Sequence, residues 1–148
     1  MAKVVEEAFD LNQESSDVTQ SDTTVDEWGD LFLYQVPTGT SHVLKKEHTF
    51  SAYLKDTNGT ELVAPMQVKI EVRDSTQSDK KVVMGPMPYA AVKDFTDARK
   101  MARLNVNEPV YIREKMFIAI MVKSTGTYGA DKDTSYFDLA MNRIRQSL

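Results

Sequence analysis

The stretch "MQVKIEVR", residues 66–73, alternates apolar and polar side chains without interruption. Successive side chains of a strand point to opposite faces, so one face of an extended chain would be apolar here and the other polar. The apolar face would carry Met66, Val68, Ile70 and Val72. Such alternation is typical of an antiparallel strand that is buried on one side only. It predicts a sheet that packs one face against a core.

The segment before this strand also favours β-structure. "HTFSAYLKD", residues 48–56, places Phe50, Ala52 and Leu54 on one side of an extended chain. The pair Asn58-Gly59 follows, and this pair favours the positive φ angles of a tight turn. We expect a hairpin here.

Two segments after residue 73 extend the sheet. Residues 109–123, "PVYIREKMFIAIMVK", are apolar on both faces in their second half, as expected of one long central strand. Residues 80–84 predict a further short strand. The prolines of "MGPMPY", residues 84–89, have no N–H for a ladder, so this part belongs to an edge or a loop.

Two segments have the pattern of short amphipathic helices. Residues 94–104, "DFTDARKMARL", begin with acids and end with bases, which suits the helix dipole. The last segment, residues 134–148, begins with Thr134 or Ser135 as a cap. Its apolar stripe would consist of Phe137, Ala140 or Met141, Ile144 and Leu148. Both helices are predicted to pack on the sheet.

The N-terminal 27 residues differ in charge from the rest of the chain. They hold one lysine and eight acids, namely Glu6, Glu7, Asp10, Glu14, Asp17, Asp22, Asp26 and Glu27. Residues 12–27 are polar and carry too few apolar side chains to offset the entropy of ordering. We therefore predict a flexible acidic arm over residues 1–27 and a folded domain over residues 28–148. "VVEEAF" and Leu11 would dock as a short helix or an added strand.

These elements predict a mainly β fold. The expected architecture is an antiparallel β-sandwich, jelly-roll-like, with one or two short helices and an extended N-terminal arm. A ferredoxin-like α+β layer is the competing arrangement. At 148 residues the chain has the size of one domain.

Composition limits the kinds of function. The chain has no cysteine, so disulfides, thiolate metal sites and cysteine nucleophiles are absent. Its longest apolar run, residues 117–122, is much shorter than the roughly 20 residues that a membrane span needs. Glu6 and Glu7 lie where a signal peptide would be apolar. We expect a soluble, non-secreted protein.

The histidines and serines give no pattern of a catalytic or metal site. His42 and His48 are the only two histidines. Six residues of extended chain separate them by about 20 Å, too far for both to bind one metal ion. No Gly-x-Ser-x-Gly motif is present, although a triad that assembles in space leaves no local signature. We predict no catalytic, cofactor-binding or metal-binding residues, no cofactor and no enzyme.

Carboxylate pairs and glycines have simpler interpretations than catalysis. Asp131 with Asp133 and Asp94 with Asp97 lie where turns and helix starts favour acids. The two glycines of residues 124–134 lack the spacing of a phosphate-binding loop. This segment is predicted to be a flexible connection.

Basic residues suggest nucleic-acid binding as an alternative. Arg99, Lys100 and Arg103 would share one face of a helix, and Lys80 and Lys81 form a second group. The net charge of -4 and the lack of aromatic residues between these cations favour solvated faces instead. Nucleic acid is therefore not an expected partner, and neither is a membrane.

One segment resembles a known group of proteins. In "LFLYQVPTGTSHVLKKEHTFSAYL", residues 31–54, an apolar strand leads into Val-Pro-x-Gly-Thr and then a second strand. It resembles the entry segment of small β-sandwich proteins among the minor capsid and decoration proteins of tailed bacterial or archaeal viruses. The resemblance implies that Val36, Pro37, Gly39 and Thr40 form a turn between two strands of a sandwich. It implies no catalytic or ligand-binding position.

The resemblance implies a virion structural protein, a minor capsid or decoration (cement) component that binds neighbouring coat subunits. The implied partners are the major capsid protein or other virion proteins, together with copies of the chain in a homo-oligomer. The implied location is the virion, assembled in the host cytoplasm. The alternative is a cellular carbohydrate-binding module that stacks sugars on Trp28, Tyr34 or Tyr53.

Overall fold

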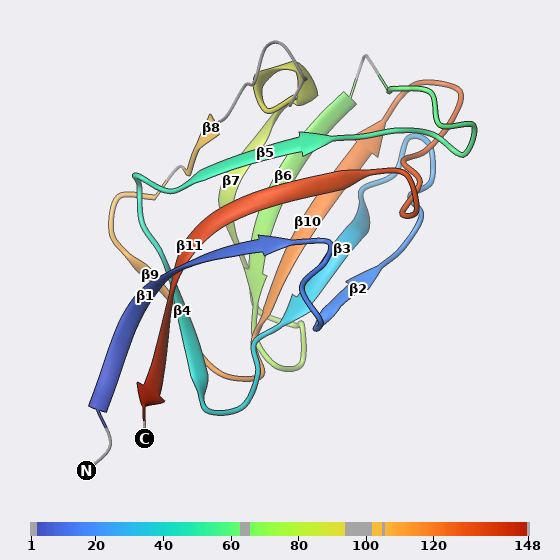
Figure 1. The fold of residues 1–148 in the computed structure, drawn as a ribbon. Helices are drawn as coiled ribbons and strands as arrows, with labels where there is room; N and C mark the ends of the chain where they lie inside the picture. The colour runs from blue at the N-terminus through green and yellow to red at the C-terminus, as the bar shows by residue number, and fades with distance from the viewer. Residues whose placement is uncertain (1–2, 63–65, 94–101, 105, 148) are drawn as a thin grey trace.

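Two antiparallel sheets lie face to face in the computed structural model of this chain (Figure 1). The structure describes residues 3–62, 66–93, 102–104 and 106–147. Strands make up most of this part, and its helical structure is one 3₁₀ turn, η1 (Tyr89–Ala91). The predicted antiparallel sandwich is confirmed. The competing α+β layer is wrong, because the second layer is a sheet.

The first sheet, here called the β10 sheet, has the strand order β2-β3-β10-β6-β7. Its members are β2 (Val18–Gln20), β3 (Gly29–Gln35), β6 (Met66–Arg73), β7 (Lys80–Pro88) and β10 (Phe117–Ser124). β6 coincides with the alternating stretch, and its four apolar residues are buried as predicted. β10 pairs with β3 on one side and β6 on the other, which confirms a central strand. β7 is an edge strand, as its prolines require.

The second sheet, here called the β11 sheet, is organised around the last strand. Its members are β1 (Lys3–Asn12), β4 (Thr40–Leu44), β5 (Thr49–Tyr53), β8 (Ala102–Arg103), β9 (Val110–Ile112) and β11 (Tyr136–Ser147). The first part of β11 pairs with β5 and the second part with β4. β1 runs along the other side of β11 in unbroken register.

The chain crosses between the sheets at the Val-Pro-x-Gly-Thr turn. β3 belongs to the β10 sheet and β4 to the β11 sheet, so this turn joins two strands of the sandwich as expected. The backbone N–H of Thr40 donates to the carbonyl of Pro37 at 3.2 Å. Gly39 has a φ of 82°, which glycine adopts without strain.

The segment predicted as one long strand at residues 109–123 also crosses. It contains β9 in one sheet and β10 in the other. A turn at residues 113–116 separates them, closed by the Met116 N–H and the Arg113 carbonyl at 3.1 Å. The predicted tight turn after β5 is confirmed, since the Gly59 N–H donates to the Asp56 carbonyl at 3.0 Å.

The core fills the space between the two sheets. Phe32 of β3 and Phe137 of β11 pack with ring centroids 4.3 Å apart and so join the layers directly. Leu11 of β1 is 1% exposed and belongs to the same core cluster. β1 is therefore part of the folded body.

Three predictions about local structure need correction. The C-terminal helix is wrong, because residues 136–147 form β11. Of the other predicted helix, residues 94–104, the first eight residues lie outside the described part; Ala102 and Arg103, near its predicted end, form β8 instead. The segment predicted as a flexible arm, residues 1–27, contains β1 and β2. This segment has too few apolar residues to be ordered by itself, and backbone pairing with β11 and the burial of Leu11 stabilise it.

No helix in the described part of the chain is long and apolar enough to cross a membrane.

Candidate interaction surface

Five strands of the described structure have a neighbour on one side only, and four of them carry features that hinder pairing with another chain. β2 and β9 have three residues each and β8 has two. β7 carries Lys80, Lys81, Pro86 and Pro88, and its register with β6 shifts twice. Short length, lysine, proline and bulges are the usual protection of an exposed sheet edge.

β1 is the exception among these edges. It has ten residues, no proline or glycine, and no register shift against β11. Apart from Asn12, whose N–H and carbonyl bond to Ser15, its outer edge therefore presents a long, regular row of backbone groups without a neighbouring strand in the described chain. Val4, on this strand, is 72% exposed.

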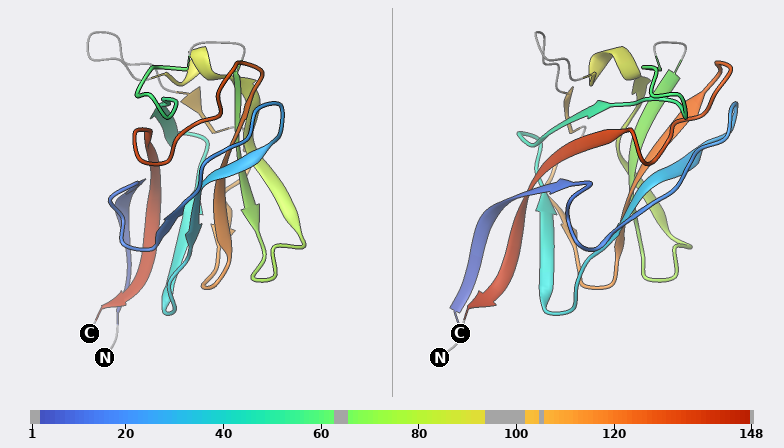
Figure 2. Two further views of the ribbon diagram at one scale, coloured as in Figure 1. Left: turned by 90° about the vertical axis from the view of Figure 1, so that its right-hand side faces the viewer. Right: turned by 45° about the vertical axis from the view of Figure 1, so that its right-hand side comes forward.

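β1 and β11 run together to one corner of the molecule, where both ends of the chain lie (Figure 1, Figure 2). β4 accompanies β11 only as far as the pair Thr40 and Arg145. Beyond that point β1 is the one described neighbour of β11. At this corner the pairs Val4–Gln146 and Lys3–Ser147 therefore have no third described strand beside β11.

An ionic cluster joins β1 to the part of β11 that also pairs with β4. Arg143 donates to Oε1 of Glu7 at 2.7 and 3.0 Å, and Arg145 donates to the same oxygen at 2.6 Å. Hydrogen bonds from Arg145 and Arg143 lower the pKa of the Glu7 carboxyl to about 2. Arg143 also lies over the ring of Phe9, 4.9 Å from its centroid. The carboxylate of Glu7 is therefore ionised and held in one place on β1.

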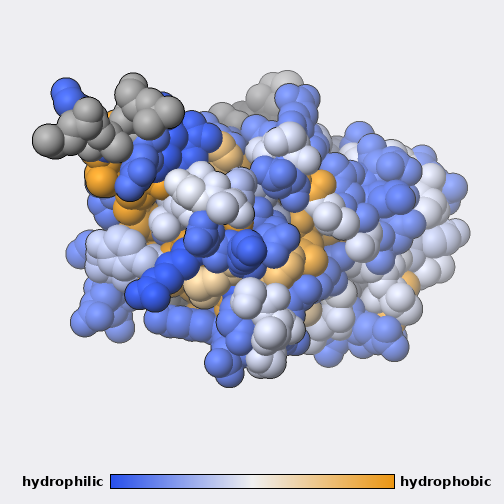
Figure 3. Space-filling view, turned by 90° about the horizontal axis from the view of Figure 1, so that it is seen from below, coloured by the Kyte–Doolittle hydropathy of each residue, from blue (hydrophilic) through white to orange (hydrophobic). Residues whose placement is uncertain are grey.

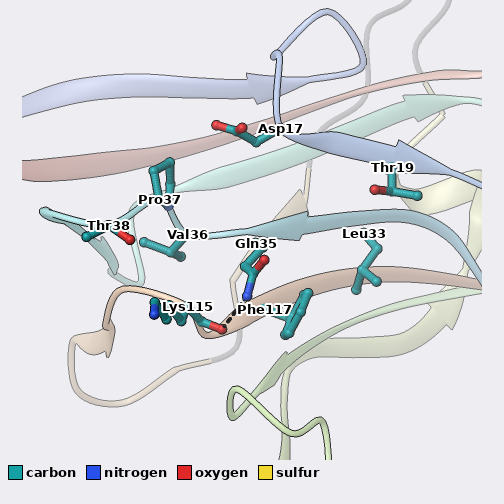
Figure 4. Close-up of a pocket in the computed structure, with 9 residues that line it drawn as sticks. All are labelled: Asp17, Thr19, Leu33, Gln35, Val36, Pro37, Thr38, Lys115 and Phe117. Carbon is teal, nitrogen blue, oxygen red and sulfur yellow. Dashed lines mark hydrogen bonds between the residues drawn. The ribbon is translucent and has the colours of Figure 1, made fainter.

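A second surface feature is an open groove beside the β3–β4 turn (Figure 4). Its volume is about 510 Å³, and it lies over the side of the β10 sheet that carries Leu33 and Phe117. Asp17 and Lys115 lie at its borders, and the Gln35 side chain donates to the Lys115 carbonyl at 3.2 Å (Figure 4). The groove has no buried polar group that would orient a small molecule, so it has the form of a contact surface.

A polar pair is buried beneath β1. His42 of β4 is 0% exposed, and its Nε2 lies 2.9 Å from the hydroxyl of Tyr34 on β3. Burial, helped by the charge of Arg143, lowers the pKa of His42 to about 4. Burial also raises the pKa of Tyr34 to about 12. Both groups are neutral at pH 7 and link the two sheets, so their position is that of a structural contact.

The outer side of the β10 sheet carries a network of ion pairs. Arg73 of β6 binds both carboxylate oxygens of Asp30 on β3, at 2.7 and 2.8 Å. Arg73 also lies 3.4 Å from Glu71, which lies 3.2 Å from Lys69. Each of these four side chains is at most 30% exposed. The network explains why Glu71 and Arg73 are buried although the sequence predicts them on the polar face of β6.

Large apolar side chains are exposed at separate places rather than in one patch. They are Val4, Val82, Tyr111, Tyr128 and Tyr136, from β1, β7, β9, a loop and β11. Figure 3 shows one end of the sandwich, where hydrophilic residues predominate and small hydrophobic areas appear between them. No broad apolar face is visible in this view.

The residues considered for a site in the sequence are not brought together. His42 contacts Tyr34, whereas Nδ1 of His48 accepts the backbone N–H of Lys45 at 2.9 Å. Asp131 accepts the N–H and hydroxyl of Thr134 and so closes a turn. No group of three metal-binding side chains occurs among residues that the structure describes. Asp94, Asp97, Arg99 and Lys100 lie outside this part.

Of the three aromatic residues considered for sugar stacking, burial excludes Tyr34, whereas Trp28 and Tyr53 are half-buried and lie in different places. Tyr34 is 4% exposed in the core, and Trp28 packs against Lys69, whose amine lies 4.5 Å from the ring. Tyr53 stacks on Tyr136 in the β11 sheet, with ring centroids 5.4 Å apart. Lys80 and Lys81 lie on β7, and Arg103 lies on β8, in different sheets. The Glu7 cluster and the buried His42 pair were missed, because each depends on which strands are neighbours.

Comparisons with known proteins agree on the fold. No protein-family model and no curated protein matches the chain. Among solved structures, VP17, a capsid protein of bacteriophage P23-77, superposes with a TM-score of 0.65 and 9% identity over 100% of both chains. A complex of VP16 and VP17, the two major capsid proteins of bacteriophage P23-77, gives 0.58 and 8% identity over 97% of this chain and 100% of that chain. The chain therefore has the sandwich fold of these phage capsid proteins over its whole length.

Proposed function

We propose that this chain is a structural protein of a virus particle that infects bacteria or archaea. The observation that carries the proposal is the end-to-end match of its fold to VP17, a phage capsid protein. The surface agrees with this role, since it offers a long sheet edge and a shallow groove. The chain would act by binding neighbours, and the expectation that it is not an enzyme remains a prediction.

The finer role that we propose is that of a minor capsid or decoration component bound to neighbouring coat subunits. VP17 occurs in a complex with VP16, a second major capsid protein of the same phage. By analogy, the partners of this chain are the major capsid protein or other virion proteins, and copies of the chain itself. Many weak contacts repeated over a symmetric shell would then stabilise the particle. The chain would be assembled into the virion in the host cytoplasm.

Quantitative mass spectrometry of gradient-purified particles tests the proposal. Particles from cells that produce this chain and release virus should contain it at a fixed ratio to the major capsid protein. This ratio should be the same from one preparation to the next after a wash in high salt. The matched control is a cytoplasmic host protein of similar size and abundance. Absence of the chain from particles at the level of this control would contradict the proposal.

A further inference from the structure

We infer that β1 is a self-pairing edge, through which two copies of this chain join by antiparallel pairing of β1 with β1. The inference deepens the proposed function, since it names one contact that a shell protein would make. It starts from the contrast between edges: three of the other described edge strands have only two or three residues, and β7 contains two prolines and two register shifts. β1 has charged residues too, but it has ten residues, no proline and no register shift. A long regular edge is a template for adding a strand from another chain.

Charge selects the second copy as the occupant and also selects the register. A twofold axis perpendicular to the sheet places the core-facing sides of the two copies on the same side of the joined sheet. In such a pair, one residue of β1 must lie directly opposite the same residue of the second copy. When Val5 is that residue, Lys3 of each copy lies opposite Glu7 of the other. Opposite charges in directly facing positions stabilise a strand pair, and like charges destabilise it.

Other registers lose this complementarity. If Glu6 or Glu7 faced its own copy, two carboxylates would be directly opposed, and with Ala8 at the axis Glu6 would face Asp10. With Val4 at the axis, Lys3 would face Val5 and gain no ionic partner. The register centred on Val5 is the one near the chain end that pairs both lysines with acids.

The side chain of Glu7 is fixed before this contact forms. Glu7 is already held by Arg143 and Arg145, both through Oε1, so little side-chain entropy remains to be lost when Lys3 of the second copy approaches. Pairing through β1 would place the strands β11-β1-β1-β11 side by side and join the β11 sheets of the two copies into one continuous sheet.

Disulfide trapping tests the contact directly, because the natural chain contains no cysteine. Directly opposed residues in antiparallel strands have Cβ atoms about 4.5–5.5 Å apart, close enough for a disulfide after small adjustment. The variant Val5→Cys should give a covalent dimer under mild oxidation of the purified full-length protein. Two controls are Ala8→Cys, on the same strand but away from the axis, and Val82→Cys, on the protected edge of β7.

Analytical ultracentrifugation of the uncrosslinked protein gives a second, independent readout. Lys3→Glu places like charges opposite each other twice per dimer and should weaken dimerisation about tenfold, as expected for two exposed ion pairs. Lys46→Glu makes the same charge change in the exposed turn after β4 and should leave dimerisation unchanged. The inference is overturned if the protein is a monomer at all concentrations, or if Val5→Cys crosslinks no faster than both controls. Since purified protein is used, this failure would be distinct from absence of the chain in particles.

Discussion

His42 makes the free energy of unfolding depend on pH. Its imidazole is buried against Tyr34, and its pKa is about 4 in the fold compared with about 6.5 for an ordinary histidine. As the pH falls, His42 is therefore protonated in the unfolded chain at a higher pH than in the folded chain. The stabilisation from His42 is complete above about pH 6.5 and is lost as the pH falls towards 4.

The expected loss is roughly 3 kcal/mol of the free energy of unfolding between pH 7 and pH 4. Urea unfolding at several pH values measures it. Carboxylates such as Glu7 also titrate near the lower end of this pH range, so the natural protein is compared with the variant His42→Phe. Between pH 7 and pH 4 the free energy of unfolding of this variant should fall by roughly 3 kcal/mol less than that of the natural protein. Parallel pH dependences for the two proteins would show that burial of His42 does not control its protonation.

Gly129 provides a test of how the β10–β11 loop is attached. A Cβ at this position would lie 1.8 Å from the backbone oxygen of Thr23, so Gly129→Ala requires a backbone shift. We expect a loss of about 2–4 kcal/mol in the free energy of unfolding. The same change at Gly126 brings a Cβ to 3.5 Å from Ser124 Oγ, an ordinary contact, and should be nearly neutral. Equal effects of the two changes in urea unfolding would contradict the close approach to Thr23.

Single residues show where sequence reasoning reached its limit. The buried side of β6 was predicted correctly because alternation of apolar residues reports burial directly. Burial of Arg73 was not, because it depends on Asp30, which is 43 positions away in sequence. No local pattern indicates that such a partner will be adjacent.

At the scale of elements, β1 shows how tertiary contacts override composition. Its acids suggested a flexible arm, yet it pairs with β11 over its full length and contributes Leu11 to the core. Leu11→Ala should therefore lower the free energy of unfolding by about 2–4 kcal/mol, as for other buried leucines. Val4→Ala, at an exposed position of the same strand, should change it by less than about 0.5 kcal/mol.

Chemical denaturation of these two variants separates a structural strand from a detached arm. A detached arm would make both substitutions neutral. The outcome also bears on truncation: removal of residues 1–27 would take away β1 and β2 and open the edges of β11 and β3. We therefore expect the truncated chain to be unstable, and point substitutions are the better probes of this segment.

β11 illustrates the ambiguity between helix and strand. Residues 134–148 contain an apolar spacing that fits a helix and residues that favour one. The same residues also alternate, with Phe137, Leu139 and Met141 buried on one side. This segment is a strand because it lies between β1 on one side and β4 and β5 on the other, and its backbone pairs with all three. Without β11, the edges of these three strands would be unpaired there. Sequence periodicity alone did not contain this information.

At the scale of the whole molecule, the sandwich could be predicted but its strand order could not. Alternation and turn residues predicted β3 to β7 and β10 as strands, but not β1, β2, β8 or β11, and they joined β9 to β10. The pairing of β1 with β11 joins the two ends of the chain, and the turns at residues 36–39 and 113–116 switch sheets. These long-range choices determine which edge is exposed, and hence the candidate surface. For this reason the surface emerged only from the structure.

The fold also places the exposed edge and the groove in a consistent arrangement for assembly. The β1 edge belongs to the β11 sheet, and the groove lies on the β10 sheet beside the turn that joins the two sheets. A shell protein needs more than one contact area in order to connect with several neighbours. The edge and the groove are separate surfaces, and under the proposed function the edge would bind a second copy and the groove a different virion protein.

Electron cryomicroscopy of particles that contain this chain tests the central claim most directly. The account predicts repeated density in the shell into which the two-sheet sandwich fits as a rigid body, with side-chain density that identifies this sequence. A shell whose density is fully explained by other proteins, with none left for this chain, would contradict it.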